Sequence, residues 1–202
     1  MLELGQRLIA SAEGRTYWLD FLAYGAIKRN IGTARAFHAI IESWNMVCAR
    51  ALLRMHIDTG LRFSAAWLVD EPHEFARKVL IGERIDRMKD SAGERLTDAH
   101  LVHTRAQEYQ WLPTVYARLS SYVHLSGSHI IDSITCIDDE QRKICFEWSE
   151  LDLKYPEFSW LEVCRCFREA TAMLGRFVTG YAHTKNMTPE ELSAARRERD
   201  SE

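Results

Sequence analysis

The sequence predicts a mainly α-helical protein, a single helical bundle with long helices and one β-hairpin inserted before the last long helix. Three observations lead to this fold class. Apolar residues recur every three or four positions through most of the chain, which is the period of one face of a helix. Only four prolines and ten glycines interrupt the 202 residues. The period becomes that of a strand only between about 130 and 148. We place a single domain at 1–187 and a charged helix or tail at 188–202.

The first third of the chain predicts two helices before a long one. Leu2 to Ala12 has apolar residues at helical spacing, and Gly14 ends this first helix. A second helix is expected from Thr16 to Arg29. Residues 30–33 then form a turn, in which Thr33 would be the N-cap of the next helix.

From Ala34 to about Val69 we expect one long helix with a kink at Gly60. One stripe of this helix is polar and steps by four residues: Glu42, Met46, Arg50, Arg54, Asp58 and Arg62. Side chains four apart on a helix touch, so the ion pairs Arg54–Asp58 and Asp58–Arg62 are predicted. The stripe is either a solvated face or a polar seam that faces a partner subunit or a phosphate.

Three shorter helices are expected before the hairpin. The first opens at Asp70-Glu-Pro and runs to about Lys89, since acidic residues and proline suit the first turn of a helix. The second begins at Thr97 or Asp98 and reaches about Gln110. The third spans Thr114 to Leu125, and Gly127 ends it.

The segments Ile130 to Ile137 and Lys143 to Trp148 are rich in β-forming residues and flank a polar turn. They predict one hairpin at about 130–148. The register of the two strands stays open at this point. A disulfide between Cys136 and Cys145 is therefore neither predicted nor excluded.

The last long helix is predicted to open at Pro156, and its apolar stripe continues to Tyr181. Thr188-Pro-Glu-Glu is a capping sequence for a final charged helix, which we expect to reach about Arg199. This helix has almost no apolar face, so we expect it to be frayed or held by a partner.

Bulk properties exclude several classes of protein. The net charge of −3 gives no overall attraction to nucleic acid or acidic membranes, although a local basic patch stays open. No apolar run reaches the roughly 18 residues of a membrane-spanning helix. The five cysteines form no CxxC pair, and no basic-then-apolar leader begins the chain. We therefore expect a cytoplasmic protein with reduced, mostly buried thiols.

No cofactor or resident metal is predicted. The chain has no glycine-rich phosphate loop, no GxSxG nucleophile elbow, no HExxH pair and no Glu-x-x-His pair. Two weaker metal sets stay as alternatives: His100 with His103, and His124 with His129 and Asp132.

The candidate site is the stretch in which Arg, His, Tyr and Ser gather at the predicted end of a helix. Four Arg–His pairs in the chain are separated by four to six residues: Arg50/His56, Arg95/His100, Arg118/His124 and Arg176/His183. We select Arg118 and His124 because they close a helix. Tyr116 and Tyr122 lie beside them, and Ser120 precedes His124 by one turn.

The segment Arg118-Leu-Ser-Ser-Tyr-Val-His124 resembles the Arg-x(4–6)-His motif of the HEPN superfamily, small helical bundles found in toxin–antitoxin and abortive-infection systems. The surrounding Tyr-Ala-Arg-Leu-Ser-Ser-Tyr-Val-His-Leu-Ser and the earlier Ala-Arg-Ala-Leu-Leu-Arg-Met-His-Ile-Asp also resemble uncharacterised bacterial all-helical proteins of that kind. The resemblance covers about residues 34–130.

This resemblance implies metal-independent RNA cleavage. His124 would move the proton of a ribose 2′-hydroxyl, because imidazole titrates near neutral pH. Arg118 would hold the phosphate as negative charge builds. The substrate-binding residues would be Tyr116, Ser120, Tyr122, Arg50 and Arg54. Two such sets would face each other across a homodimer, with RNA as substrate and an antitoxin-like protein as a partner.

The alternative is a non-catalytic helical protein whose long helices form a dimer face. His124 would then be a helix-terminal histidine, satisfied by a carbonyl or by Ser120, and Arg118 a surface residue. The two hypotheses differ in geometry. The enzyme needs Arg118 and His124 in one open, basic cleft, whereas the interaction protein needs only an apolar face.

Overall fold

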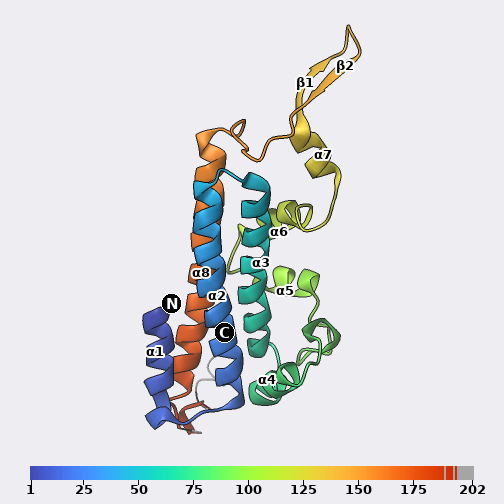
Figure 1. Ribbon diagram of the computed structural model, residues 1–202. Coiled ribbons are helices and arrows are strands. Elements are labelled where there is room, and N and C mark those ends of the chain that lie inside the picture. Colours follow the sequence, from blue (N-terminus) through green and yellow to red (C-terminus); the bar gives the residue numbers. More distant parts are fainter. Residues whose placement is uncertain (189, 193, 195–202) are drawn as a thin grey trace.

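The computed structural model of the chain describes residues 1–188, 190–192 and 194. These residues are mainly helical, and they contain one two-stranded antiparallel sheet, which lies just before the last long helix (Figure 1). The predicted fold class is confirmed. Within this described part, no helix combines the length and the apolar composition needed to cross a membrane.

Three long helices run side by side and form the body of the molecule: α2 (Trp18–Glu42), α3 (Met46–Ser64) and α8 (Glu157–Thr184) (Figure 1). The apolar faces of all three meet in one core, which includes Phe37, Leu53, Ile57, Leu61, Phe167, Met173, Leu174 and Val178. Helix α1 (Leu2–Ala10) packs against α8 and α2 near the chain ends. A short 3₁₀ turn, Ser11–Gly14, leads from α1 towards α2.

Two polar contacts join the end of α8 to the first residues of the chain. The Lys185 ammonium pairs with the Asp20 carboxylate at 3.1 Å, and both side chains are buried. The Ala12 amide donates to the Asn186 side-chain oxygen at 2.7 Å. Because a buried charge is costly without its partner, the Lys185–Asp20 pair fixes the end of α8 against the start of α2.

The predicted turn at residues 30–33 is wrong, because α2 continues through it to Glu42. The Thr33 hydroxyl donates to the Arg29 and Asn30 carbonyls of its own helix, at 3.0 Å each. Asn30 and Thr33 are buried and face His56 of α3. These polar residues therefore bind a buried histidine in the core and do not end a helix.

The predicted long helix at 34–69 is also wrong, because the chain reverses between α2 and α3. Trp44 has a φ of +53°, and the Asn45 side chain caps α3 by accepting the Cys48 amide at 2.9 Å. The Asp152 carboxylate adds a second cap, since it accepts the Met46 amide at 2.7 Å. The reversal lays α2 and α3 side by side (Figure 1).

Gly60 does not kink α3, which passes through it without a break. A Cβ atom built on Gly60 would lie 2.6 Å from the Met173 Cε atom of α8. Because Gly60 has no side chain, α3 can pack closely on α8 at this position.

The connecting helices are shorter than predicted. Helix α4 (Pro72–Leu80) ends before Gly82, which has a φ of +97°, and a 3₁₀ turn follows at Ile85–Arg87. Helix α5 (Asp98–Arg105) begins after Thr97, whose hydroxyl accepts the His100 amide at 3.3 Å. Helix α6 (Leu112–Ser120) carries its proline in the first turn and stops five residues before the predicted end.

An additional short helix, α7 (Gly127–Ser133), precedes the hairpin and was not predicted. Strands β1 (Ile134–Asp138) and β2 (Lys143–Phe146) pair Cys136 directly with Cys145, and the two residues form a disulfide. This finding corrects the expectation of reduced, mostly buried thiols, since Cys48 is also exposed. The hairpin projects beyond the helical body as an arm (Figure 1).

The predicted C-terminal helix, 188–199, falls largely outside the described residues. Its predicted cap is present: the Glu191 amide donates to the Thr188 hydroxyl at 3.3 Å, and the Thr188 amide donates to the Glu191 carboxylate at 2.7 Å. Residues 190–192 and 194 are helical.

A buried histidine, His56, lies where α2, α3 and α8 meet, and it is 1% exposed. Its Nε2 atom accepts from the Asn30 side chain at 3.2 Å and lies 2.8 Å from the Thr171 hydroxyl. Its Nδ1–H donates to the Thr33 hydroxyl at 2.8 Å, because the Thr33 hydrogen already points to a backbone carbonyl. The ring stacks on Phe167 with centroids 3.8 Å apart. His56 is therefore a neutral core residue.

Burial, and to a smaller extent the charge of Arg29, lowers the pKa of His56 to about 4. In the unfolded chain His56 takes up its proton near pH 6.5, whereas the folded chain resists protonation down to about pH 4. Between these values the unfolded state binds more protons, so the stability of the fold falls as the pH falls. We expect this histidine to remove on the order of 3 kcal/mol between pH 6.5 and pH 4.

Urea unfolding of the wild type and of His56→Gln at several pH values tests this expectation. The variant should be less stable at pH 7 but should lose less stability on acidification. Exposed His103 provides the matched control, and His103→Gln should keep the wild-type pH dependence. Equal acid sensitivity of the wild type and His56→Gln would contradict the assignment.

Candidate functional site

The polar stripe of α3 is covered by α5, α6 and α7, on the side that faces away from the core. Asp58 lies 3.6 Å from Arg54 and 3.4 Å from Arg62, so both predicted ion pairs are confirmed. The three side chains are only 13–27% exposed. The stripe is therefore not a solvated face. It is a polar seam within the chain, which we call the arginine seam (Arg50, Arg54, Asp58 and Arg62).

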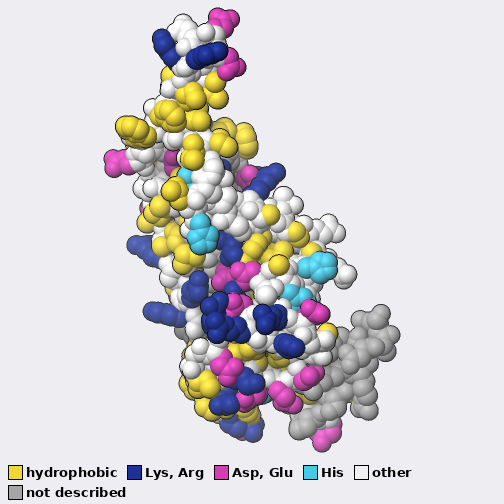
Figure 2. All heavy atoms as spheres, turned by 90° about the vertical axis from the view of Figure 1, so that its right-hand side faces the viewer, with side chains coloured by type: hydrophobic (Ala, Val, Ile, Leu, Met, Phe, Trp, Pro, Cys, Tyr) yellow, Lys and Arg dark blue, Asp and Glu magenta, His cyan; other side chains and the backbone are white. Residues whose placement is uncertain are grey.

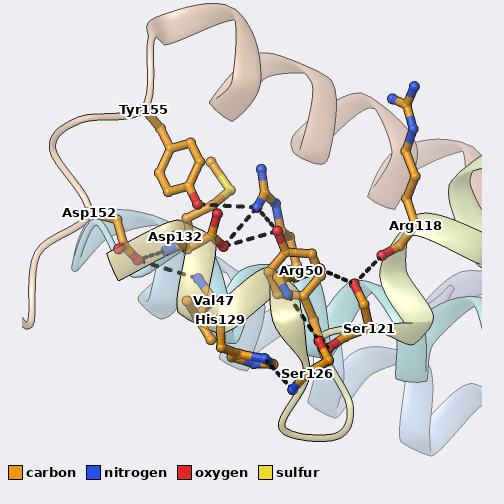
Figure 3. A network of polar contacts seen from close by, with 12 residues as sticks. Val47, Arg50, Arg118, Ser121, Ser126, His129, Asp132, Asp152 and Tyr155 are labelled. Carbon is orange, nitrogen blue, oxygen red and sulfur yellow. Dashed lines mark hydrogen bonds and ion pairs between the residues drawn. The ribbon is translucent and has the colours of Figure 1, made fainter. Parts of the chain in front are cut away.

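The upper part of the arginine seam is organised by Arg50. Its guanidinium donates to the Tyr122 hydroxyl and, at 3.3 Å, to the Tyr155 hydroxyl. It also lies 4.7 Å from the centre of each of these two rings. The Asp132 carboxylate is 3.5 Å from Arg50 and accepts the Tyr122 hydroxyl at 3.0 Å (Figure 3). This cluster joins α3 to the loop after α6, to α7 and to the segment before α8.

The lower part of the arginine seam is organised by Arg54. Its guanidinium donates to the Tyr116 hydroxyl of α6 and lies 3.6 Å from the centre of that ring. Asp98 of α5 accepts from Arg54 at 3.3 Å and from Arg62 as well. Burial raises the pKa values of Tyr116 and Tyr122, so both phenols keep their protons at neutral pH. These phenols act in the seam as neutral hydrogen-bonding groups.

The predicted catalytic pair lies outside both clusters. Arg118 is exposed on α6, and its guanidinium points away from Arg50 (Figure 3). His124 is exposed in the loop that follows α6. The expectation that both residues share one helix is wrong, because α6 ends at Ser120. Among the described residues, no acidic side chain pairs with either of them.

Serine side chains fix the loop that carries His124. The Ser121 hydroxyl donates to the Arg118 carbonyl at 2.8 Å, and the Ser126 hydroxyl donates to the Ser121 carbonyl at 2.7 Å. Ser126 also caps α7, and the Ser128 hydroxyl lies 2.9 Å from that of Ser121. These contacts close residues 121–126 into a compact loop with His124 on its exposed part. Ser120, the expected partner of His124 in the non-catalytic alternative, instead donates to the Tyr116 carbonyl at 2.8 Å.

Two open grooves flank α6 and divide the predicted site residues between them. The groove towards α8 has a volume of about 310 Å³, and its lining includes Arg50, Arg118 and Tyr122. The groove towards α5 has a volume of about 530 Å³, and its lining includes Arg54, Tyr116 and Ser120. His124 lines neither groove. The structure thus divides the predicted substrate-binding residues into two sets, and His124 belongs to neither.

The first groove is the more basic of the two. Arg50 and Arg118 line it from α3 and α6, and Glu162 of α8 is the only acid among the described residues that form its wall. Ser121, Tyr122, Ser128 and Ser159 also line it. Arg50 is already bound by Asp132 and the tyrosine hydroxyls, so Arg118 is the arginine of this groove that has no acidic partner among the described residues.

The alternative metal sets are not assembled. Asp132 is held by Arg50 and Tyr122, the His129 ring accepts the Ser126 amide at 3.3 Å, and His100 lies 2.7 Å from Asp90. In the part of the chain that the structure describes, no three His, Cys, Asp or Glu side chains are placed to hold a metal ion together.

Sequence reasoning missed three residues that organise the arginine seam: Asp98, Asp132 and Tyr155. The sequence pattern marks Asp98 only as a helix cap and Asp132 only as a metal ligand. No local pattern marks them as partners of arginines 36 to 105 positions away. The one available signal was the stripe itself, because arginines on a helix that is buried on several sides require acidic partners.

Comparison with known proteins adds no family assignment. No protein-family model matches the chain, and searches of curated proteins and of solved structures also gave no match.

The arginine seam makes a testable distinction between two arginines. Arg54→Met removes a 13% exposed guanidinium and leaves Asp58 and Asp98 with one cation fewer, so we expect a loss of about 2–4 kcal/mol of unfolding free energy. Arg118→Met is the matched control on α6, and its exposed position predicts a change within about 0.5 kcal/mol. Urea unfolding followed by circular dichroism measures both. Equal destabilisation by the two substitutions would refute a structural role specific to Arg54.

Proposed function

We propose that the protein is a metal-independent ribonuclease that binds RNA in the basic groove beside α6. The observation that carries the proposal is that Arg118 and His124 are both exposed, on α6 and on the loop that follows it, and that neither pairs with an acidic side chain of the described chain. Arg118 lines the groove without an acidic partner in the described chain, and His124 lies six residues later on a loop that serines hold in place. The resemblance to the Arg-x(4–6)-His motif supports the same two residues.

The chemistry needs a base for the 2′-hydroxyl of the ribose and a cation for the phosphate. His124 takes the hydroxyl proton, and the freed oxygen attacks the adjacent phosphorus. A 2′,3′-cyclic phosphate forms as the bond to the 5′-oxygen breaks, and that oxygen takes up a proton from water as it leaves. His124 then gives its proton to the solvent. Arg118 stabilises the negative charge that builds on the phosphate oxygens. RNA as substrate favours a cytoplasmic location, whereas disulfides such as Cys136–Cys145 are rare in that compartment.

The arginine seam has a supporting role in this proposal. Arg50 and Tyr122 border the groove but are held by Asp132 and Tyr155, so they shape the groove wall and contribute charge. Arg54, Tyr116 and Ser120 lie in the second groove, where a longer RNA strand would pass. The rings of Tyr116 and Tyr122 lie against Arg54 and Arg50, so in this proposal they shape the groove walls.

Cleavage of a fluorescently labelled single-stranded RNA, with EDTA present, tests the proposal. We expect His124→Ala to lower the rate at least about 100-fold, since general acid–base groups contribute 10²–10⁴-fold. Arg118→Ala should lower it by a similar factor, because it removes the phosphate-binding cation.

The controls are an exposed histidine and an exposed arginine on α2, His38 and Arg35. His38→Ala and Arg35→Ala should cleave at the wild-type rate. If the wild type shows no cleavage, or if His124→Ala retains the wild-type rate, the ribonuclease proposal fails.

One observation favours the second candidate function, a non-catalytic protein that acts through association. The hairpin arm exposes large apolar side chains, among them Ile137 at 64% and Trp148 at 95%. Exposed apolar patches of this kind mark protein–protein contact sites.

A further inference from the structure

The hairpin has one apolar face and one polar face. Ile137 lies directly opposite Ile144, and Ile134 lies opposite Phe146, while Cys136 pairs with Cys145. Side chains alternate between the two faces of a strand, so Ile144 and Phe146 share one face and Cys145 lies on the other. The irregular register between Ile134 and Cys136 inserts one extra residue in β1. This bulge brings Ile134 and Ile137 to the same face, although three positions separate them.

Nothing in the described chain covers this apolar face. The hairpin contacts mainly itself and α7, and it projects beyond the helical body (Figure 1). Ile137, Ile144 and Phe146 are each more than half exposed. A two-stranded hairpin without a packing partner is only marginally stable in water. The disulfide holds the two strands together on the polar face, but it covers no apolar surface.

Seven large apolar side chains of the arm and its base are more than half exposed: Leu125, Ile130, Ile131, Ile137, Ile144, Phe146 and Trp148. Three of them, Ile137, Ile144 and Phe146, lie on the hairpin face, and the other four lie beside it in α7 and in the flanking segments. The interface would have to include these neighbours to approach the ~800 Å² that each partner buries in a standard interface. Hydrophobic side chains gather below the charged tip of the arm (Figure 2).

We propose that the apolar face of the hairpin is a docking surface for the same face of a second copy of this chain. The two hairpins then form a small β-sandwich with their apolar faces inside. The proposal gives the second candidate function a surface and a partner, and it does not depend on RNA cleavage.

The charges at the tip of the arm fit a second copy. The turn at the tip carries Asp139 and Glu140 on the β1 side and Arg142 on the β2 side, while Asp138 and Lys143 lie opposite each other on the polar face. A two-fold axis along the arm, between the two apolar faces, lays β1 of one copy over β2 of the other. The acidic side of each tip then meets the basic side of the other tip. A partner that carried charges of one sign would be attracted to only one side of the tip and repelled by the other.

The oligomeric state tests the proposal, measured by sedimentation velocity in non-reducing buffer over a range of concentrations. Cys48→Ser serves as the background, because Cys48 is exposed and could otherwise link two chains covalently. We expect a dimer with a Kd of about 10 µM or tighter. Ile137→Asp should raise this Kd at least about 100-fold, since it buries a charge in the apolar interface.

The matched control is Ile81, which follows α4 at the other end of the molecule and is 62% exposed (Figure 1). Ile81→Asp should leave the dimer intact. Charge reversal gives a second test that does not disturb the apolar face. Asp139→Arg and Arg142→Asp should each weaken the dimer about 10-fold, and the double variant should restore it.

A monomer at every concentration overturns the proposal and assigns the apolar face to a different macromolecule. A dimer that survives Ile137→Asp also overturns it, since the interface then lies elsewhere. Far-ultraviolet circular dichroism of each variant verifies that the helical body is folded, so a loss of the dimer reports on the arm.

Discussion

The arrangement of this protein depends on the pairing of the charges on α3. The side chains of Arg50 and Arg54 are 20% and 13% exposed, and charged groups so far from water are costly unless partners satisfy them. Their partners, Asp98 and Asp132, lie on α5 and α7. The need to pair these charges therefore holds the connecting helices against the long-helix core.

Helix α3 thus organises the molecule from two sides. Its apolar side packs against α2 and α8 around the neutral His56, and its arginine seam contacts α5, α6 and α7. Because the seam positions α6 and the serine loop, it also places Arg118 and His124 at the surface. The histidines of two other Arg–His pairs already have structural roles: His56 is buried in the core, and His100 is hydrogen-bonded to Asp90. Arg118 and His124 have no such partners in the described chain.

Local periodicity predicted most of the helices and the hairpin, because apolar faces repeat within a short window of sequence. The errors occurred where a distant residue decides the local structure. Asn30 and Thr33 are residue types typical of turns, but here they bind His56 in the core. Gly60 is a residue type that often marks a kink, but here it makes room for Met173. The reversal at Trp44 depends partly on Asp152, more than a hundred positions away. Of the site, the arginine stripe and its internal pairs were predictable, but its partners on α5 and α7 were not.

The arginine seam is predicted to hold α5–α7 on α3 in addition to the apolar contacts that Leu101, Leu112 and Leu119 make in the core. Amide hydrogen exchange of the wild type, Arg54→Met and Arg118→Met, resolved by residue, tests this prediction most directly. We predict that Arg54→Met accelerates exchange in α5 and α6, while α2 and α8 stay protected and Arg118→Met matches the wild type. Unchanged protection of α5 and α6 in Arg54→Met, or an equal loss of protection in all helices, would contradict the account.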